Sequence, residues 1–302
     1  MRRRLARQAI VNFLAVVELR TKLVSVSTLM LATLYVSWRK EPPQPYPLAL
    51  MWMATLAVDM GTTAFNNYFD YWRGTDRFHK VDEPDKVVAR AVVEPGFAFW
   101  VAFWCFAVAV IPGFLLALAG ALWVIPAGAA CMLVGFLYTG GPFPISRTPF
   151  GELVAGASLG LALFAIACGV WAVPLDSHVV VAALPSFFWI AAILAVNNTC
   201  DIEGDRLAGR KTWPVMTGPR GGELTIMLLG LGAQLAGILA GLHGYLPRLV
   251  SATMLAGSLP IALILASMHR DGFSHATKGL NMRRILLCLA FATMAMACGY
   301  IS

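Results

Sequence analysis

Charged side chains are scarce in this chain. Asp, Glu, Lys and Arg make up 13 % of its 302 residues, whereas an ordinary soluble domain carries about 25 %. Hydrophobic side chains make up 59 %, and apolar runs of about twenty residues recur from end to end. A soluble domain needs a polar shell that this composition does not supply. A soluble enzyme is therefore excluded, and a protein of the lipid bilayer is indicated.

The chain also lacks the patterns of a disulfide framework, a thiolate metal site and a nucleic-acid interface. Its six cysteines show no CxxC spacing, and most lie inside apolar runs. The net charge of +7 comes from Lys and Arg residues between apolar runs, not from one basic stripe with interleaved aromatic residues. We therefore expect no nucleic acid among its partners. The basic N-terminus lacks the short apolar run and cleavage site of a signal peptide, so we expect none to be removed.

Apolar runs of bilayer length predict an all-α membrane protein with nine transmembrane helices in a single multi-pass domain, residues 1–302. Gly120 divides the stretch 96–139, which is too long for one span. The predicted helices cover residues 22–38, 47–70, 96–119, 121–139, 150–173, 182–202, 222–243, 247–269 and 285–301.

The distribution of basic residues predicts the orientation of these helices. With the N-terminus in the cytoplasm, twenty of the 23 Lys and Arg residues fall on the cytoplasmic side. The odd number of spans then places the C-terminus outside, and we expect the protein in the cell membrane. The two longest loops, about 71–95 and 203–221, face the cytoplasm and are expected to form a cap. We therefore expect the function on the cytoplasmic face.

Two similar polar segments follow the second and sixth predicted helices. The segments are NNYFDYWRGTD at 66–76 and NNTCDIEGDR at 197–206, and both contain NNxxD. They lie four predicted helices apart, so they reach the same surface, which suggests two four-helix quasi-repeats around a cavity open to the cytoplasm, plus one extra helix. Residues four apart share a helix face, which predicts one stripe of Asn66 and Asp70 and another of Asn197, Asp201 and Asp205. We expect Gly74 to end the first helix and to return Asp76 to the site.

These side chains suit a Mg²⁺–diphosphate complex. Mg²⁺ binds hard oxygen ligands, commonly one or two carboxylates together with substrate phosphates. The neighbouring cations Arg73, Arg77, Arg206, Arg210 and Lys211 are suited to phosphate oxygens. The plainer interpretation of any one of these residues is a solvated helix end. A paired motif that starts inside apolar spans favours function, because polar groups at membrane depth are costly.

At these residues the sequence resembles the UbiA superfamily of intramembrane prenyltransferases. Within it, the segments 66–76, YTGGP at 138–142 and 197–212 are most similar to the members that prenylate 1,4-dihydroxy-2-naphthoate in menaquinone synthesis. The resemblance implies Asn66, Asp70, Asp76, Asp201 and Asp205 as Mg²⁺ ligands. It implies catalytic roles for Asp70 and Asp201, with Tyr138 near the reacting allylic carbon.

The remaining site expectations concern substrate contacts. The candidate diphosphate contacts are Asn67, Arg73, Arg77, Asn197, Arg206, Lys211 and Arg147, and the candidate acceptor contacts are Arg20, Lys22 and Asn198. The plainer interpretation of Arg20 and Lys22 is snorkelling at the membrane interface. Two positions depart from the family pattern, since Asn67 stands where Asp is usual and Cys200 stands where naphthoate enzymes often have Arg.

The expected function is Mg²⁺-dependent transfer of a prenyl group from a polyprenyl diphosphate to an aromatic acceptor. The acceptor implied by the resemblance is 1,4-dihydroxy-2-naphthoate, which loses CO₂. A UbiA-type enzyme with another acceptor, such as hydroxybenzoate or homogentisate, and a membrane terpene cyclase stay open, because both would keep the diphosphate site. A transporter is the remaining alternative, although transporters place their binding residues near the midplane of the membrane.

Overall fold

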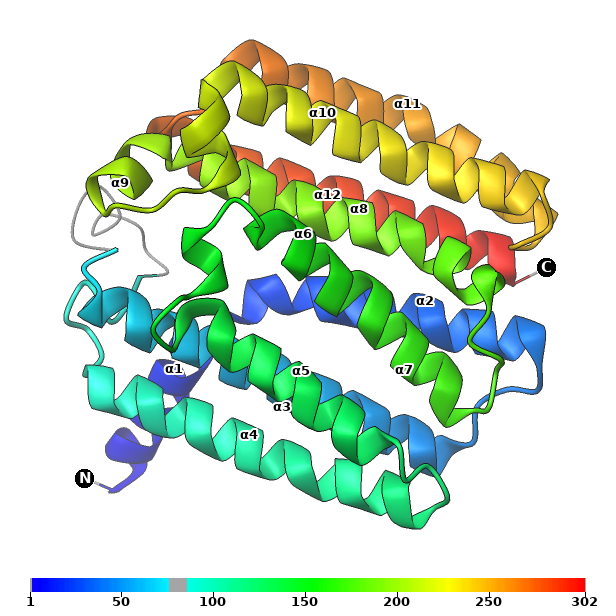
Figure 1. The fold of residues 1–302 in the computed structure, drawn as a ribbon, viewed down its shortest axis with the longest axis horizontal. Coiled ribbons are helices and arrows are strands. Elements are labelled where there is room, and N and C mark those ends of the chain that lie inside the picture. The colour runs from blue at the N-terminus through cyan, green and yellow to red at the C-terminus, as the bar shows by residue number, and fades with distance from the viewer. Residues whose placement is uncertain (1, 76–85, 302) are drawn as a thin grey trace. The chain divides into compact units, whose positions relative to one another are not determined.

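In a computed structural model, residues 2–75 and 86–301 are described, and all of their regular elements are helical (Figure 1). The chain divides into two compact units, each described here by itself. Unit 1 comprises residues 1–22, 50–148 and 203–210, and unit 2 comprises residues 23–49, 149–202 and 211–302. The all-α prediction is confirmed for the described residues.

Unit 1 gathers the N-terminal helix and the helices before and after the first polar segment. Its elements are α1 (Arg2–Val16), η1 (Leu19–Lys22), α3 (Pro45–Trp72, of which residues 45–49 count with unit 2), α4 (Pro95–Leu118), α5 (Val124–Thr139), η3 (Ile145–Arg147) and most of α9 (Ile202–Leu207). Phe65 of α3 is nearly buried, and its ring meets Phe106 of α4 and Phe136 of α5 edge to face. Gly61 allows this packing, because an added Cβ would lie 2.7 Å from the Phe106 ring.

Unit 2 is built around α8. Its elements are α2 (Leu23–Arg39), α6 (Gly151–Ala155), the π-helical turn η4 (Gly156–Ala162), α7 (Leu163–Val170), α8 (Ser177–Cys200), α10 (Trp213–Leu242), α11 (Arg248–Asp271) and α12 (His275–Tyr300). In the apolar part of α8, 67 % of the span is buried, the largest share among the candidate spans. Close approach of η4 requires Gly160, where an added Cβ would lie 2.5 Å from the Phe187 Cα atom.

Eight helices in the described ranges are long and apolar enough to cross a membrane. The one predicted span that is not among these eight is 121–139, which corresponds to α5. This helix has 16 residues and therefore extends about 24 Å, whereas the hydrocarbon core is about 30 Å thick. The number of nine spans stays a prediction, as do the cytoplasmic cavity and the quasi-repeats.

Two predicted boundaries are wrong because helices continue beyond their apolar runs. The expected loop 203–221 contains α9, and α10 already begins at Trp213, with a kink at Gly218 where φ is 78°. The last helix begins at His275 rather than 285, because Ser274 and Thr277 form a capping box ahead of the apolar run. Of the other expected cap loop, residues 76–85 lie outside the described part of the chain.

Candidate functional site

The first polar segment straddles the end of α3. Gly74 adopts φ 68°, the Thr75 N–H donates to the Asp70 carbonyl at 3.0 Å, and the Gly74 N–H donates to the Tyr71 carbonyl at 3.1 Å. This pair of hydrogen bonds is a Schellman cap, which needs a left-handed residue that glycine provides without strain. The prediction that Gly74 ends the helix is confirmed. Asp76 and Arg77 lie outside the described residues.

The turn after α5 holds the outer part of this segment. The buried Thr139 hydroxyl donates to Asn66 Oδ1 at 2.7 Å, and the Arg73 guanidinium donates to the Thr139 carbonyl at 2.8 Å and to the Gly141 carbonyl. The same threonine therefore contacts a candidate metal ligand and a candidate phosphate contact. Half-buried Tyr138 precedes it in the last turn of α5.

The side chain of Asn67 contacts different residues from those that its neighbour Asn66 contacts. Its Nδ2 donates to the Val16 carbonyl at 3.0 Å, to Glu18 Oε1 at 3.1 Å and to the Thr63 carbonyl at 3.3 Å. Three acceptors on one side determine the orientation of the amide, because its oxygen would be repelled there. Only 2 % of Asn67 is exposed, so this residue fastens the connection after α1 to the end of α3.

The Arg73 guanidinium interacts with the charges of Arg147 and Asp70 in unit 1. Burial lowers the pKa of Arg73, the charge of Arg147 lowers it further, and the charge of Asp70 opposes both effects. Arg147 donates to the Ala208 carbonyl at 2.6 Å, which joins η3 to the end of α9. Two like charges held near each other favour an anion between or beside them, because an anion relieves their repulsion.

The second polar segment is divided between two helices. α8 ends at Cys200 and α9 begins at Ile202, so Asp201 stands at the junction and its N–H bonds to the Asn198 carbonyl. The prediction of one continuous stripe through Asn197, Asp201 and Asp205 is therefore wrong, because the four-residue rule holds only along an unbroken helix.

Asp201 is a buried carboxylate with a cationic partner in unit 2. Its exposed fraction is 3 %, and Oδ2 accepts from Lys278 Nζ of α12 at 2.8 Å. His275 Nδ1 of the same helix lies 3.8 Å from Oδ1. Burial of this carboxylate is thus compensated by a charge from an element far along the chain.

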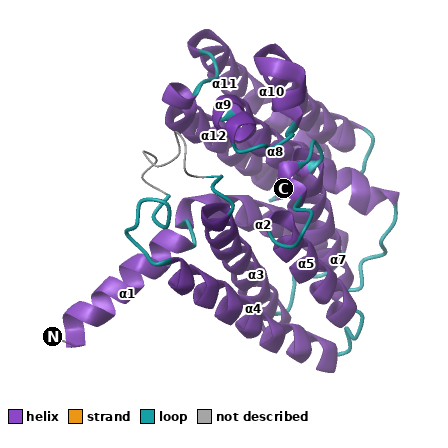
Figure 2. Cartoon of the chain, turned by 60° about the vertical axis from the view of Figure 1, so that its left-hand side comes forward, coloured by secondary structure: helices purple, strands orange, loops and turns teal. Residues whose placement is uncertain are grey.

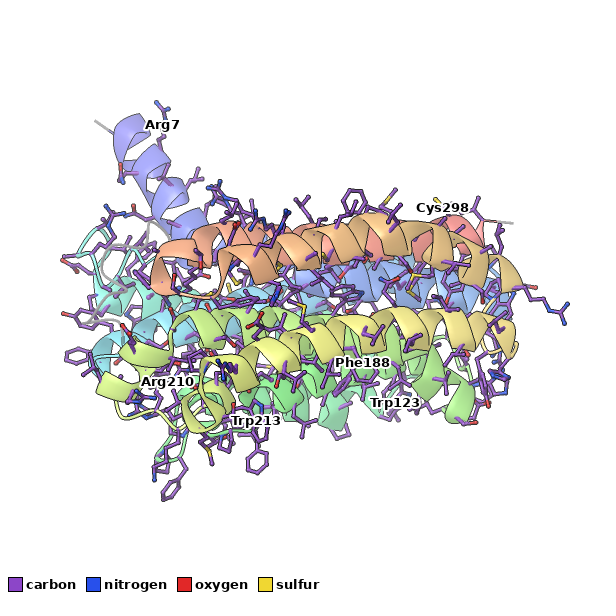
Figure 3. The ribbon with its side chains drawn as sticks, turned by 90° about the horizontal axis from the view of Figure 1, so that it is seen from above. Arg7, Trp123, Phe188, Arg210, Trp213 and Cys298 are labelled. Carbon is purple, nitrogen blue, oxygen red and sulfur yellow. The ribbon has the colours of Figure 1, made fainter. Side chains whose placement is uncertain are left out.

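Asp205 is a second buried carboxylate, this one in unit 1. It is 0 % exposed and pairs with Arg210 at 2.8 Å, and Arg210 also donates to the Ser146 carbonyl at 2.7 and 3.2 Å. Arg210 is labelled in Figure 3. Gly209 adopts φ 69°, and the N–H groups of Arg210 and Gly209 donate to the carbonyls of Asp205 and Arg206. α9 therefore ends in the same cap as α3, with Asp205 at the position of Asp70.

The asparagine pair of the second segment lies in a buried polar group of unit 2. Asn198 Nδ2 donates to Glu152 Oε1 at 2.8 Å, and Asn197 Nδ2 lies 3.5 Å from Asn198 Oδ1. Arg206 and Lys211 are exposed, and their contact with phosphate stays a prediction.

The two basic residues expected at the acceptor differ in their surroundings. Arg20 is exposed. Lys22 is 3 % exposed and donates to Asp59 Oδ1 at 2.5 Å and to Thr63 Oγ1 at 2.7 Å. This ion pair joins η1 to the middle of α3.

Three residues in contact with the motifs were not assigned to the site from the sequence. They are Thr139, Glu152 and Lys278. Thr139 lies inside the YTGGP segment, so it had a local signal. Glu152 and Lys278 had none, since their partners are distant in sequence.

The donor set is compatible with Mg²⁺. Asn66, Asp70 and Asp205 in unit 1, and Asp201 in unit 2, each carry oxygen donors of the type that hard cations prefer. Within the described residues no three His, Cys, Asp or Glu side chains form a preformed metal cluster. Substrate phosphates supply the remaining ligands in sites of this kind.

Solved structures identify the type of fold. A UbiA homologue from Archaeoglobus fulgidus, solved with GPP and Mg²⁺, matches with a TM-score of 0.69 and 13 % identity over 96 % of this chain and 99 % of its own. At this identity the similarity concerns the fold alone.

The family follows from the sequence. The profile of the UbiA prenyltransferase family matches residues 25–287, and the chain belongs to this family. A 1,4-dihydroxy-2-naphthoate octaprenyltransferase of Bacillus subtilis is 31 % identical over 57 % of this chain, and the match spans 55 % of that relative, about half its length. A digeranylgeranylglyceryl phosphate synthase of Natronomonas pharaonis is 29 % identical over 78 % of this chain and 79 % of its own length.

Proposed function

We propose that this protein transfers a prenyl group from a polyprenyl diphosphate to an aromatic acceptor in a Mg²⁺-dependent reaction. We further propose 1,4-dihydroxy-2-naphthoate as the acceptor, with loss of CO₂, in menaquinone synthesis. Family membership and the name of the Bacillus subtilis relative support this choice. The Natronomonas pharaonis relative carries a different name, so the acceptor needs a direct test.

The observation that carries the proposal is the pair of guanidinium groups of Arg73 and Arg147. Each is held by backbone carbonyls, and the pKa of Arg73 is lowered first by burial and further by the charge of Arg147. Keeping two cations together at the end of a membrane-length helix costs free energy that a multiply charged anion recovers. A diphosphate has the charge and the oxygen spacing for such a pair.

Each motif residue then has a proposed role. Asp70, Asp201, Asp205, Asp76 and Asn66 would hold Mg²⁺, which would supply positive charge to the diphosphate. The proposed phosphate contacts are Arg73, Arg77, Arg147, Asn197, Arg206 and Lys211. The three donations of Asn67 favour a positioning role over a phosphate contact.

The chemical step proposed here is an electrophilic substitution. The allylic carbon–oxygen bond breaks, and its electron pair leaves with the diphosphate. The ring carbon that bears the carboxylate supplies the electron pair of the new carbon–carbon bond. Loss of CO₂ returns an electron pair to the ring and restores aromaticity. The proposed role of Tyr138 is to stabilise the allylic cation through its π face, and Arg73 and Arg147 stabilise the departing diphosphate.

The test is a product assay with purified protein, Mg²⁺ and geranylgeranyl diphosphate, with and without 1,4-dihydroxy-2-naphthoate. We expect a prenylated, decarboxylated naphthoquinol by mass spectrometry, with release of diphosphate and CO₂. Chelation of Mg²⁺ by EDTA should abolish it. A hydrocarbon or alcohol product without acceptor would instead indicate a terpene cyclase, and no Mg²⁺-dependent consumption at any prenyl length would contradict the proposal.

Matched variants test the site itself. Asp70→Asn should stop diphosphate release while preserving the melting temperature, because Asn keeps the shape and loses the charge. Glu203→Gln changes an exposed acid of the second polar segment that has no assigned role in the site, so it serves as the control and should retain activity. Full turnover of Asp70→Asn would contradict the assignment.

A further inference from the structure

The N-terminal helix α1 stands apart from the candidate membrane spans. It ends at Val16, Glu18 adopts the left-handed φ of 48°, and the turn η1 follows before α2 begins at Leu23. A positive φ in a residue other than glycine is uncommon and breaks a helix. α1 is therefore a separate element and does not extend the first span.

Hydrogen bonds place the end of α1 at the margin of the membrane. The Val16 carbonyl and the Glu18 carboxylate both accept from Asn67. Asn67 lies about five residues before the end of α3, or roughly 7 Å along the helix axis. Since α3 is a candidate span, the end of α1 lies close to where that span leaves the hydrocarbon.

One side of α1 packs against the other helices of unit 1, and another side is exposed. Val16 is fully buried and Phe13 packs against the same apolar cluster. Ile10, Val11 and Leu14 are 60 %, 51 % and 41 % exposed. They share a face with exposed Arg7, since Ile10, Val11 and Leu14 follow it by three, four and seven positions. Figure 2 shows the N-terminal end of α1 reaching beyond the other helices of unit 1, and Figure 3 labels Arg7 on it.

The charge of this segment is of one sign. Arg2, Arg3, Arg4 and Arg7 are its charged residues, and Glu18 is the first acid in the chain. Each basic residue near an anionic lipid surface contributes a favourable interaction, and exposed aliphatic side chains gain from insertion at the level of the headgroups. A surface that is both anionic and partly apolar therefore complements this face.

We propose that α1 is an interfacial helix that docks on an anionic lipid surface. Ile10, Val11 and Leu14 insert among the headgroups, and Arg7 contacts lipid phosphates. The docking goes beyond prenyl transfer and does not depend on it. Through Asn67, the docked helix is fastened to the last part of α3.

Protection from trypsin tests the docking without an activity assay. The full-length protein is placed in nanodiscs of phosphatidylcholine alone or of phosphatidylcholine with phosphatidylglycerol, and cleavage after Arg7 is followed by mass spectrometry. We expect cleavage to be at least about fivefold slower with the anionic lipid, the effect of one engaged basic residue. Added salt should reduce the protection by screening.

A variant pair distinguishes apolar insertion from charge alone. The double variant Ile10→Ser with Leu14→Ser should lose most of the protection, whereas Gln8→Ser, which changes a polar exposed residue of the same helix, should keep it. The ratio of the two lipids within each variant removes any change in the intrinsic trypsin rate. Equal cleavage in both lipids, or undiminished protection of the double variant, would overturn the proposal. Protection that grows with protein concentration in detergent would indicate a second copy of the chain and would also overturn it.

Discussion

The amide of Asn67 shows how one atom type determines the role of a residue. An aspartate, which the family resemblance leads one to expect there, has no N–H to give. It would also set a second negative charge near Glu18, whose Oε1 accepts from Asn67 at 3.1 Å. The acceptors around residue 67 require a hydrogen-bond donor there. The first motif therefore carries one carboxylate fewer than the family pattern.

We predict that Asn67→Asp destabilises the protein by about 3 kcal/mol, because it buries an unpaired charge and leaves acceptors unsatisfied. Differential scanning fluorimetry in detergent would show a lowered melting temperature. Adding Glu18→Gln should recover part of the loss, because the glutamine can donate to the new carboxylate. Glu18→Gln alone keeps an acceptor for Asn67 and is the control. No recovery in the double variant would refute direct pairing of these two residues.

Lys22 and Asp59 form a buried ion pair, and both residues can be replaced by apolar residues in one variant. Their side chains are 4 % and 11 % exposed. Lys22→Met alone should cost about 3–5 kcal/mol because it leaves Asp59 uncompensated, and the double variant Lys22→Met with Asp59→Leu should regain most of this stability. Thermal unfolding in detergent measures both.

The same double variant tests whether Lys22 contacts the acceptor. If the ion pair only stabilises the fold, the double variant should keep the KM of the unchanged protein for the acceptor. A raised KM in a variant of normal stability would instead support the acceptor contact expected from the sequence.

At the scale of elements, α3 and α9 end in the same way. Both have an aspartate four residues before a left-handed glycine, Asp70 with Gly74 and Asp205 with Gly209, and both place the same two backbone hydrogen bonds there. The alignment by NNxxD pairs Asp70 with Asp201 instead. The two aspartates with matching local backbone both belong to unit 1.

We predict that Gly74→Ala and Gly209→Ala each lower stability by about 1 kcal/mol, because alanine is strained at positive φ. Gly204→Ala within α9 is the matched control. A Cβ at Gly204 meets no atom within 4 Å, so this change should be neutral or slightly stabilising by helix propensity. Melting temperatures compare the three variants, and equal effects at all three positions would argue against the capping role.

At the scale of the whole molecule, the number of crossings determines where the C-terminus lies. Eight helices in the described ranges have the length and hydropathy of a span, and α5 with 16 residues falls short. If α5 crosses, the termini are on opposite sides. If it does not, they share one side.

We predict that α5 crosses and that the C-terminus is outside, as the basic residues indicate. In bacterial cells, alkaline phosphatase fused after residue 301 should be active and green fluorescent protein fused there should be dark. Fusions to the N-terminus should give the opposite result for the fluorescent protein. Fluorescence at both ends would mean eight crossings.

The sequence predicted most helices because length and hydropathy are local properties. It also predicted the glycine that ends α3, since the stop signal lies within the segment it ends. The sequence did not predict the starts of α10 at Trp213 and α12 at His275, because these helices begin before their apolar runs. It also did not predict the end of α8 at Cys200, where no glycine or proline marks the end of the helix. Those ends depend on capping and on packing within the unit.

Composition and motif spacing by themselves predicted an all-helical membrane protein with its acidic segments at helix ends, and the residues of those segments carried the resemblance to the UbiA family. Only the tertiary structure decided how each buried charge is compensated. Asp201 pairs with Lys278 and Asn198 with Glu152, although these partners are far apart along the chain. A buried carboxylate needs a partner whatever its position in the sequence. Which side chain satisfies it depends on which helices pack together, and residue spacing carries no record of that.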